Sequence, residues 1–92
     1  MQLLKPLPFN KAAELSEMIT SVIKHNKMFI YHYFEQSLNR DYENKLDSYV
    51  RITEVNGICV PIILEKDLPA WLNSFLLDCY EFAHNRLVSE QS

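Results

Sequence analysis

The dipeptide Asn56-Gly57 constrains the fold of this chain more than any other local feature, because Gly57 is its only glycine. Both residues tolerate a positive φ angle, and a two-residue type I′ turn requires that angle at both central positions. Runs rich in apolar and β-branched residues lie on either side of the dipeptide. This pattern predicts a β-hairpin whose strands span residues 49–55 and 58–64.

The turn also predicts which residues of the hairpin face each other. Counting outward from it places Ile52 opposite Pro61 in a non-hydrogen-bonded pair. A further strand beside residues 58–64 would need the N–H group that Pro61 lacks, so we expect these residues to form the edge of the sheet. A strand at 28–36 would then pair with 49–55 on its other side and complete a three-stranded antiparallel meander.

The aromatic segment 28–36 allows two interpretations. Its aromatic and β-branched residues favour a strand, whereas the spacing of its apolar residues also fits a second helix that continues as far as residue 46. We adopt the strand and interpret the polar residues 38–47 as a solvated connection. The helix remains the alternative.

Two helices are predicted outside the sheet. Residues 10–25 carry apolar side chains at spacings of three and four, with glutamates in the first half and basic residues at the end, as the helix dipole favours. Residues 67–88 show the same spacing, which predicts a buried stripe that includes Leu72, Cys79 and Phe82. Pro69 lies in the first turn of this helix, where its missing N–H group costs nothing. Two prolines make residues 1–9 an extended lead-in. The predicted fold class is α+β, in the order α-β-β-β-α, with two helices packed on the meander sheet.

Size and charge narrow the classes of protein to which the chain can belong. Residues 1–92 have the size of one domain. The formal net charge of −3 argues against non-specific binding to nucleic acid or to an anionic membrane. The sequence shows neither the pattern of a signal peptide nor an apolar stretch near the ~20 residues of a membrane span. We therefore expect a cytoplasmic protein in which Cys59 and Cys79 are buried thiols, with a disulfide between them as the alternative.

The residue types of catalytic and metal sites occur here without the spacing that such sites need. His25, His32 and His84 show no metal-ligand spacing, and we expect His84 at a solvent-facing position of the last helix. A chain with one glycine cannot build a Gly-rich phosphate loop, and Cys79 lies on an apolar helix face where a thiolate is disfavoured. We expect no enzymatic activity, no cofactor and no metal site.

The predicted sheet has more apolar surface than two helices readily cover. Strand 58–64 is apolar on both faces, so one face stays partly bare unless the N-terminal residues fold back over it. The bare face carries Val50 and Ile63, or alternatively the set that contains Ile62. Exposed apolar surface of this kind often marks an interface. The candidate partner-binding residues are Phe29, Tyr31, Tyr33, Arg40, Tyr42, Val50, Ile52, Pro61 and Ile63.

These observations predict a small acidic, non-catalytic protein–protein interaction module of the inhibitor, adaptor or chaperone type, such as a phage or plasmid accessory protein. The alternative is a homodimeric structural or regulatory subunit with a site at the dimer interface. A third, less supported hypothesis is a nucleic-acid-associated protein, because the order α-β-β-β-α is similar to that of double-stranded-RNA-binding domains. Those domains use a basic cluster at the start of the last helix, where residues 66–70 supply a single lysine.

Overall fold

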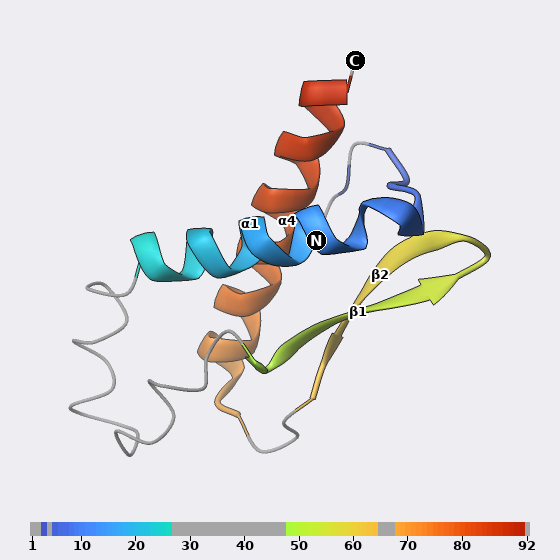
Figure 1. The fold of residues 1–92 in the computed structure, drawn as a ribbon. Helices are drawn as coiled ribbons and strands as arrows, with labels where there is room; N and C mark the ends of the chain where they lie inside the picture. Colours follow the sequence, from blue (N-terminus) through green and yellow to red (C-terminus); the bar gives the residue numbers. More distant parts are fainter. Residues whose placement is uncertain (1–2, 4, 27–47, 65–67, 92) are drawn as a thin grey trace.

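The computed structural model describes residues 3, 5–26, 48–64 and 68–91, which form two longer helices and a two-stranded antiparallel sheet (Figure 1). This part of the chain confirms the α+β class. The predicted strand 28–36, its helical alternative and the polar connection 38–47 lie outside the described residues. The elements are the 3-10 helix η1 (Phe9–Lys11), helix α1 (Ala12–His25), strand β1 (Val50–Val55), strand β2 (Ile58–Ile63) and helix α4 (Ala70–Gln91).

The hairpin forms where the sequence predicts it. Asn56 and Gly57 have φ angles of 54° and 81°, as a type I′ turn requires. Strands β1 and β2 pair in the predicted register. Each strand is one residue shorter than predicted at its open end, although the N–H group of Leu64 still donates to the C=O group of Tyr49 at 2.8 Å. The lone glycine therefore determines the local structure as expected.

Gly57→Val should lower the free energy of unfolding by about 1–2 kcal/mol. Apart from its chain neighbours, no heavy atom lies within 4 Å of a Cβ atom built on Gly57, so the cost comes from a β-branched residue held at positive φ and not from a clash. Urea unfolding followed by circular dichroism measures the change. Gly57→Asn is the matched control, because asparagine adopts a positive φ more readily and should lose less. Equal stability of Gly57→Val and the wild type would contradict the type I′ turn.

Helix α1 begins two residues later than predicted, because the chain first makes the single turn of η1. The N–H group of Lys11 donates to the C=O group of Pro8 at 3.0 Å, and Asn10 lies inside this turn instead of capping the helix. At the other end, the backbone N–H group and Nδ2 of Asn26 both donate to the C=O group of Val22, at 3.2 and 2.8 Å. The buried residues of α1 are Leu15, Ile19 and Ile23.

Helix α4 begins directly after Pro69 and extends three residues beyond its predicted end. The C=O group of Pro69 accepts hydrogen bonds from the N–H groups of Leu72 and Asn73, at 3.0 and 3.1 Å, which closes the first turn. Phe82 was predicted on the buried stripe of this helix, but its side chain is exposed. The buried residues of α4 are Leu72, Leu76, Cys79, Tyr80, Ala83, His84, Leu87 and Val88.

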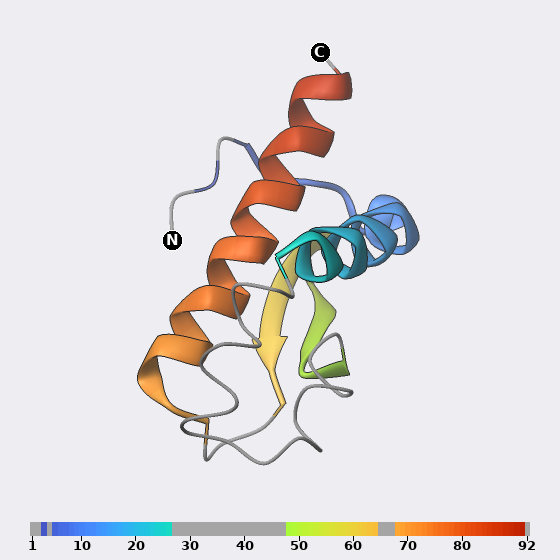
Figure 2. The same cartoon turned by 90° about the vertical axis from the view of Figure 1, so that its left-hand side faces the viewer.

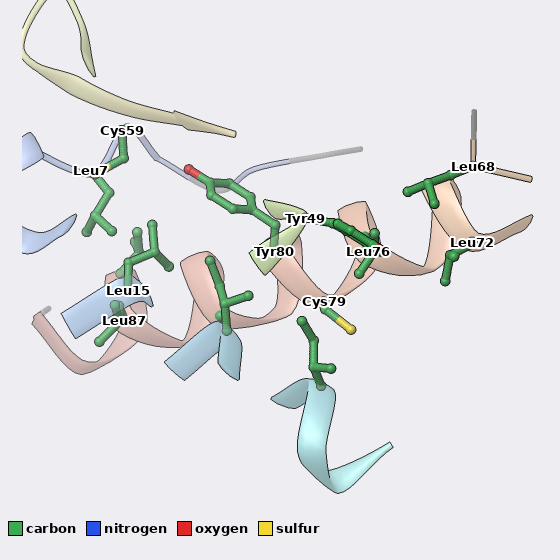
Figure 3. Packing of buried hydrophobic residues seen from close by; sticks show 14 residues of the cluster. Leu7, Leu15, Tyr49, Cys59, Leu68, Leu72, Leu76, Cys79, Tyr80 and Leu87 are labelled. Atoms are coloured by element: carbon green, nitrogen blue, oxygen red, sulfur yellow. The ribbon is translucent and has the colours of Figure 1, made fainter. Parts of the chain in front are cut away.

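Helix α4 buries a wider face than one apolar stripe because two neighbours lie beside each other against it. Helix α1 crosses α4, and the hairpin and the N-terminal segment lie next to that crossing (Figures 1 and 2). Side chains outside the predicted stripe, such as Tyr80, are therefore covered as well. Figure 3 shows how Leu15 of α1, Leu76 of α4 and Tyr49 beside the hairpin contribute to a single core.

The N-terminal segment, predicted as a lead-in, is part of this core. Leu7 is fully buried, and its C=O group accepts a hydrogen bond from the N–H group of Cys59 at 2.8 Å. The N–H group of Phe9 donates to the C=O group of Gly57 at 2.9 Å. Pro8 lies between these two bonds, at a position where the pairing needs no N–H group from it. Pro8 would disrupt a central strand, but it is compatible with this short pairing between the N-terminal segment and β2.

This contact refines the prediction that β2 is a bare edge. The N-terminal segment pairs with the edge of β2 that does not face β1. The contact lies close to the turn, where Cys59 supplies an N–H group. Pro61, two residues further along, has no N–H group to supply. Within the described ranges, no strand continues the sheet beyond it. Pro61 therefore limits the length of the pairing but does not prevent it.

His84 is fully buried, which corrects the prediction that it faces solvent. Its Nε2 atom lies 2.6 Å from the C=O oxygen of Lys5. Because a carbonyl oxygen can only accept, Nε2 carries the proton and donates. The ring of Tyr80 lies next to it, with ring centroids 5.6 Å apart. Helix α4 and strand β2 thus both hold the N-terminal segment by hydrogen bonds.

Candidate protein-binding surfaces

The two faces of the hairpin lie in different surroundings. Residues paired across the strands share a face, which places Val50, Ile52 and Ile63 together with Cys59. The first three pack against the core and Cys59 is buried. One side of the hairpin lies toward the helices (Figure 2), and the packing of these residues against the core identifies it as their side. It is the inner face of the hairpin.

The structure places four of the nine predicted partner-binding residues on this inner face. Val50, Ile52, Pro61 and Ile63 are half-buried there. The sequence could not distinguish the covered face from the open one, because strand β2 is apolar on both. The other five predicted residues lie outside the described part of the chain: Phe29, Tyr31, Tyr33, Arg40 and Tyr42.

The opposite face of the hairpin, the set that contains Ile62, is the open one. Three of its large apolar side chains are between 41% and 47% exposed. Within Val50–Val55 and Ile58–Ile63, Arg51 is the one charged residue on this side of the sheet. A largely uncharged apolar surface is therefore available to a partner. We call this side the outer hairpin face, and its apolar residues are Val55, Ile58, Val60, Ile62 and Leu64.

A second surface lies where α1 crosses α4. An open groove of about 640 Å³ occupies the corner between α1 and the C-terminal half of α4. Both of its long walls are helices, whose backbone groups bond within the helix. Side chains therefore determine what this helical groove can bind. Its apolar residues are Met18, Val22, Phe82 and Leu87.

Carboxylates are in excess among the charged residues of the helical groove. Glu14, Glu17 and Glu90 line it, together with the single guanidinium group of Arg86. Nε of Arg86 lies 3.5 Å from the carboxylate of Glu90, and Nζ of Lys11 lies 3.4 Å from that of Glu14. Glu17 has no ion-pair partner within the described ranges. Both pairs are exposed and contribute little energy. With three carboxylates and one guanidinium group, the lining of the groove carries a net negative charge.

Phe82 borders the helical groove with 55% of its surface exposed. On its other side, a shallow depression of about 670 Å³ continues along α4 past Asp78 and Glu81. Sequence reasoning missed this surface because the crossing of the two helices depends on tertiary packing. The sequence does place the acidic residues Glu14 and Glu17 three residues apart in the first helix and close to Met18. This combination of acidic and apolar residues could have indicated a binding surface on that helix.

The two cysteines are free and buried, so the disulfide alternative is not formed. Burial raises the pKa of the Cys59 thiol. Burial, and to a smaller extent the neighbouring carboxylate of Asp78, raises the pKa of Cys79 to about 12. Near neutral pH both groups are therefore protonated thiols, which are poor nucleophiles.

The described residues hold no group of three or more His, Cys, Asp or Glu side chains that could bind a metal ion. Among the described helices, none combines the length and the apolar character needed to cross a membrane. Comparisons of the chain with protein-family models, with curated proteins and with solved structures found no match.

Proposed function

We propose that this chain is a small non-catalytic protein-binding module that acts by covering an apolar surface of a partner protein. The observation that carries this proposal is the outer hairpin face, where large apolar side chains remain exposed on a side of the sheet with one charged residue. The core of a protein–protein interface is similarly depleted of charge. Inhibitors, adaptors and chaperones of this size act through surface contact alone.

The rigidity of the hairpin supports the same proposal. Its turn is closed by Gly57, and its inner face is packed against the core through Val50, Ile52 and Ile63. The outer side chains are therefore held in fixed positions before a partner arrives, which lowers the entropy cost of binding. We also propose a cytoplasmic location, because two free thiols suit a reducing compartment.

Affinity capture from a lysate of the source cells tests the proposal with three forms of the chain. Ile62→Lys places a charge in the middle of the outer hairpin face, and Ala13→Lys places the same charge on an exposed position of α1. We expect the wild type and Ala13→Lys to retain the same protein and Ile62→Lys to lose it, with similar thermal unfolding of all three. Retention by Ile62→Lys at the wild-type level, or capture of no protein by the wild type, would contradict the proposal.

A second candidate function is a homodimer that packs two outer hairpin faces together. Within Val50–Val55 and Ile58–Ile63, the outer hairpin face carries no acidic residue. Two such faces can therefore meet without burying unpaired carboxylates, which favours the homodimer. Light scattering at tens of micromolar decides between the two. A mass of twice 10.9 kDa that falls to 10.9 kDa in Ile62→Lys supports the homodimer, and a wild-type monomer excludes it.

A further inference from the structure

We propose that the helical groove between α1 and α4 binds a basic amphipathic helix of a partner protein. This surface is separate from the outer hairpin face, and the inference goes beyond the function proposed above. It rests on the shape of the groove, on the exposed aromatic side chain at its border and on its charge.

The walls of the groove favour a helical occupant. An extended peptide gains affinity when its backbone pairs with free N–H and C=O groups, as at a sheet edge. The walls here are helices, and even at the end of α1 the carbonyls of Ser21 and Val22 are bonded to the side chains of His25 and Asn26, both at 2.8 Å. A helix satisfies its own backbone and needs only side-chain contacts. A helical segment of a partner can therefore bind in this groove without leaving its own backbone groups unpaired.

The apolar residues of the groove suit the apolar face of such a helix. Met18 and Val22 are four residues apart on α1 and so lie on one side of it. Phe82 is 55% exposed and borders the groove from α4. The flexible side chain of a methionine adapts to partners of different shape. Covering the exposed part of the Phe82 side chain would remove apolar surface from water, which favours binding. Apolar side chains at helical spacing on the partner would fill the corner between them.

The charge of the groove selects a basic partner. Three carboxylates line it against one guanidinium group, which already lies 3.5 Å from Glu90. Within the described residues Glu17 has no ion-pair partner, and it is the carboxylate that we expect a lysine or arginine of the occupant to contact. The net charge of −3 adds a long-range attraction for a basic segment. An acidic helix of the same shape would be repelled.

A pair of synthetic peptides tests this inference on the full chain. Both are 14-residue helices with leucines at positions 3, 6, 7 and 10, and their other positions carry either lysine and alanine or glutamate and alanine. Fluorescence anisotropy measures their affinity, and NMR spectra of the ¹⁵N-labelled protein locate the contact. We expect the lysine peptide to bind more strongly at low salt than at high salt and to shift the signals of Met18, Val22 and Phe82. The glutamate peptide should not bind.

Two variants and two controls make the result specific. Phe82→Ala and Glu17→Lys should each weaken binding of the lysine peptide by about tenfold or more. Glu54→Lys makes the same charge change on an exposed residue of the hairpin and should have a smaller effect. Ile62→Lys should leave peptide binding intact, which separates this inference from the proposed function.

Three results would overturn the inference. These are equal binding of both peptides, an unchanged affinity in Phe82→Ala, and NMR shifts confined to residues outside the groove. Light scattering adds a fourth: if the wild type is a dimer that Phe82→Ala dissociates, the groove is filled by a second copy of the chain and not by a basic helix.

Discussion

Tyr80→Ala should lower the free energy of unfolding by about 3–5 kcal/mol. Among the described residues, Tyr80 is the largest side chain that is fully buried. It projects from α4 toward Leu7 and Cys59, at the place where the helix, the hairpin and the N-terminal segment meet (Figure 3). Its removal leaves a cavity that three elements border. Urea unfolding followed by circular dichroism measures the loss, which is a large share of the stability of a small domain.

Tyr80→Phe is the matched control for this prediction. The Tyr80 hydroxyl is buried and has no hydrogen-bond partner within the described ranges. A buried polar group without a partner costs free energy, so its removal should leave stability unchanged or raise it by about 1 kcal/mol. If Tyr80→Phe lost as much as Tyr80→Ala, the contribution of Tyr80 would come from its hydroxyl and not from packing. If Tyr80→Ala lost less than about 1 kcal/mol, Tyr80 would not be a core residue.

Leu7→Ala should lower the free energy of unfolding by about 2–5 kcal/mol, because Leu7 is fully buried between the hairpin and the helices. The substitution keeps the backbone bond from Cys59 to residue 7 possible, so the loss reports packing alone. Urea unfolding gives the value. Leu64→Ala removes the same side chain from an exposed position of the outer hairpin face and should cost far less.

The Leu7 prediction tests whether the N-terminal segment is a structural element. A two-stranded hairpin alone is marginally stable, and here residues 7–9 extend its hydrogen bonding on the outer side of β2. Equal losses in Leu7→Ala and Leu64→Ala would contradict this role. A loss in the expected range would show that the segment holds the hairpin against α4.

The parts of the fold that follow from local chemistry were predictable. The turn at Asn56 and Gly57, the register of β1 with β2 and the position of Pro61 all depend on backbone rules that act within a few residues. Helix α1 begins two residues later than predicted and ends as predicted, and both ends of α4 are displaced by three residues. The two displaced starts arise where a short 3-10 turn precedes α1 and where Pro69 precedes α4, since either arrangement satisfies the same end groups.

The parts that depend on a neighbouring element were not predictable in the same way. His84 was expected in solvent and is buried, because the C=O group of Lys5 happens to lie beside it. Phe82 was expected in the core and is exposed, because α1 crosses α4 along another side. The sequence left open whether the bare face of the hairpin carries Val50 and Ile63 or Ile62, and the structure packs Val50 and Ile63 against the core. Each of these residues has a side chain whose type fits either environment.

The sequence by itself determined the hairpin, its register and the two amphipathic helices, because glycine, proline and apolar spacing act on the backbone within a few residues. Only the tertiary structure decided which face of the hairpin the helices cover, how the N-terminal segment closes the core and where α1 and α4 leave a groove between them. Those outcomes depend on packing between segments far apart in the chain, and apolar residues on both faces of β2 are compatible with either choice.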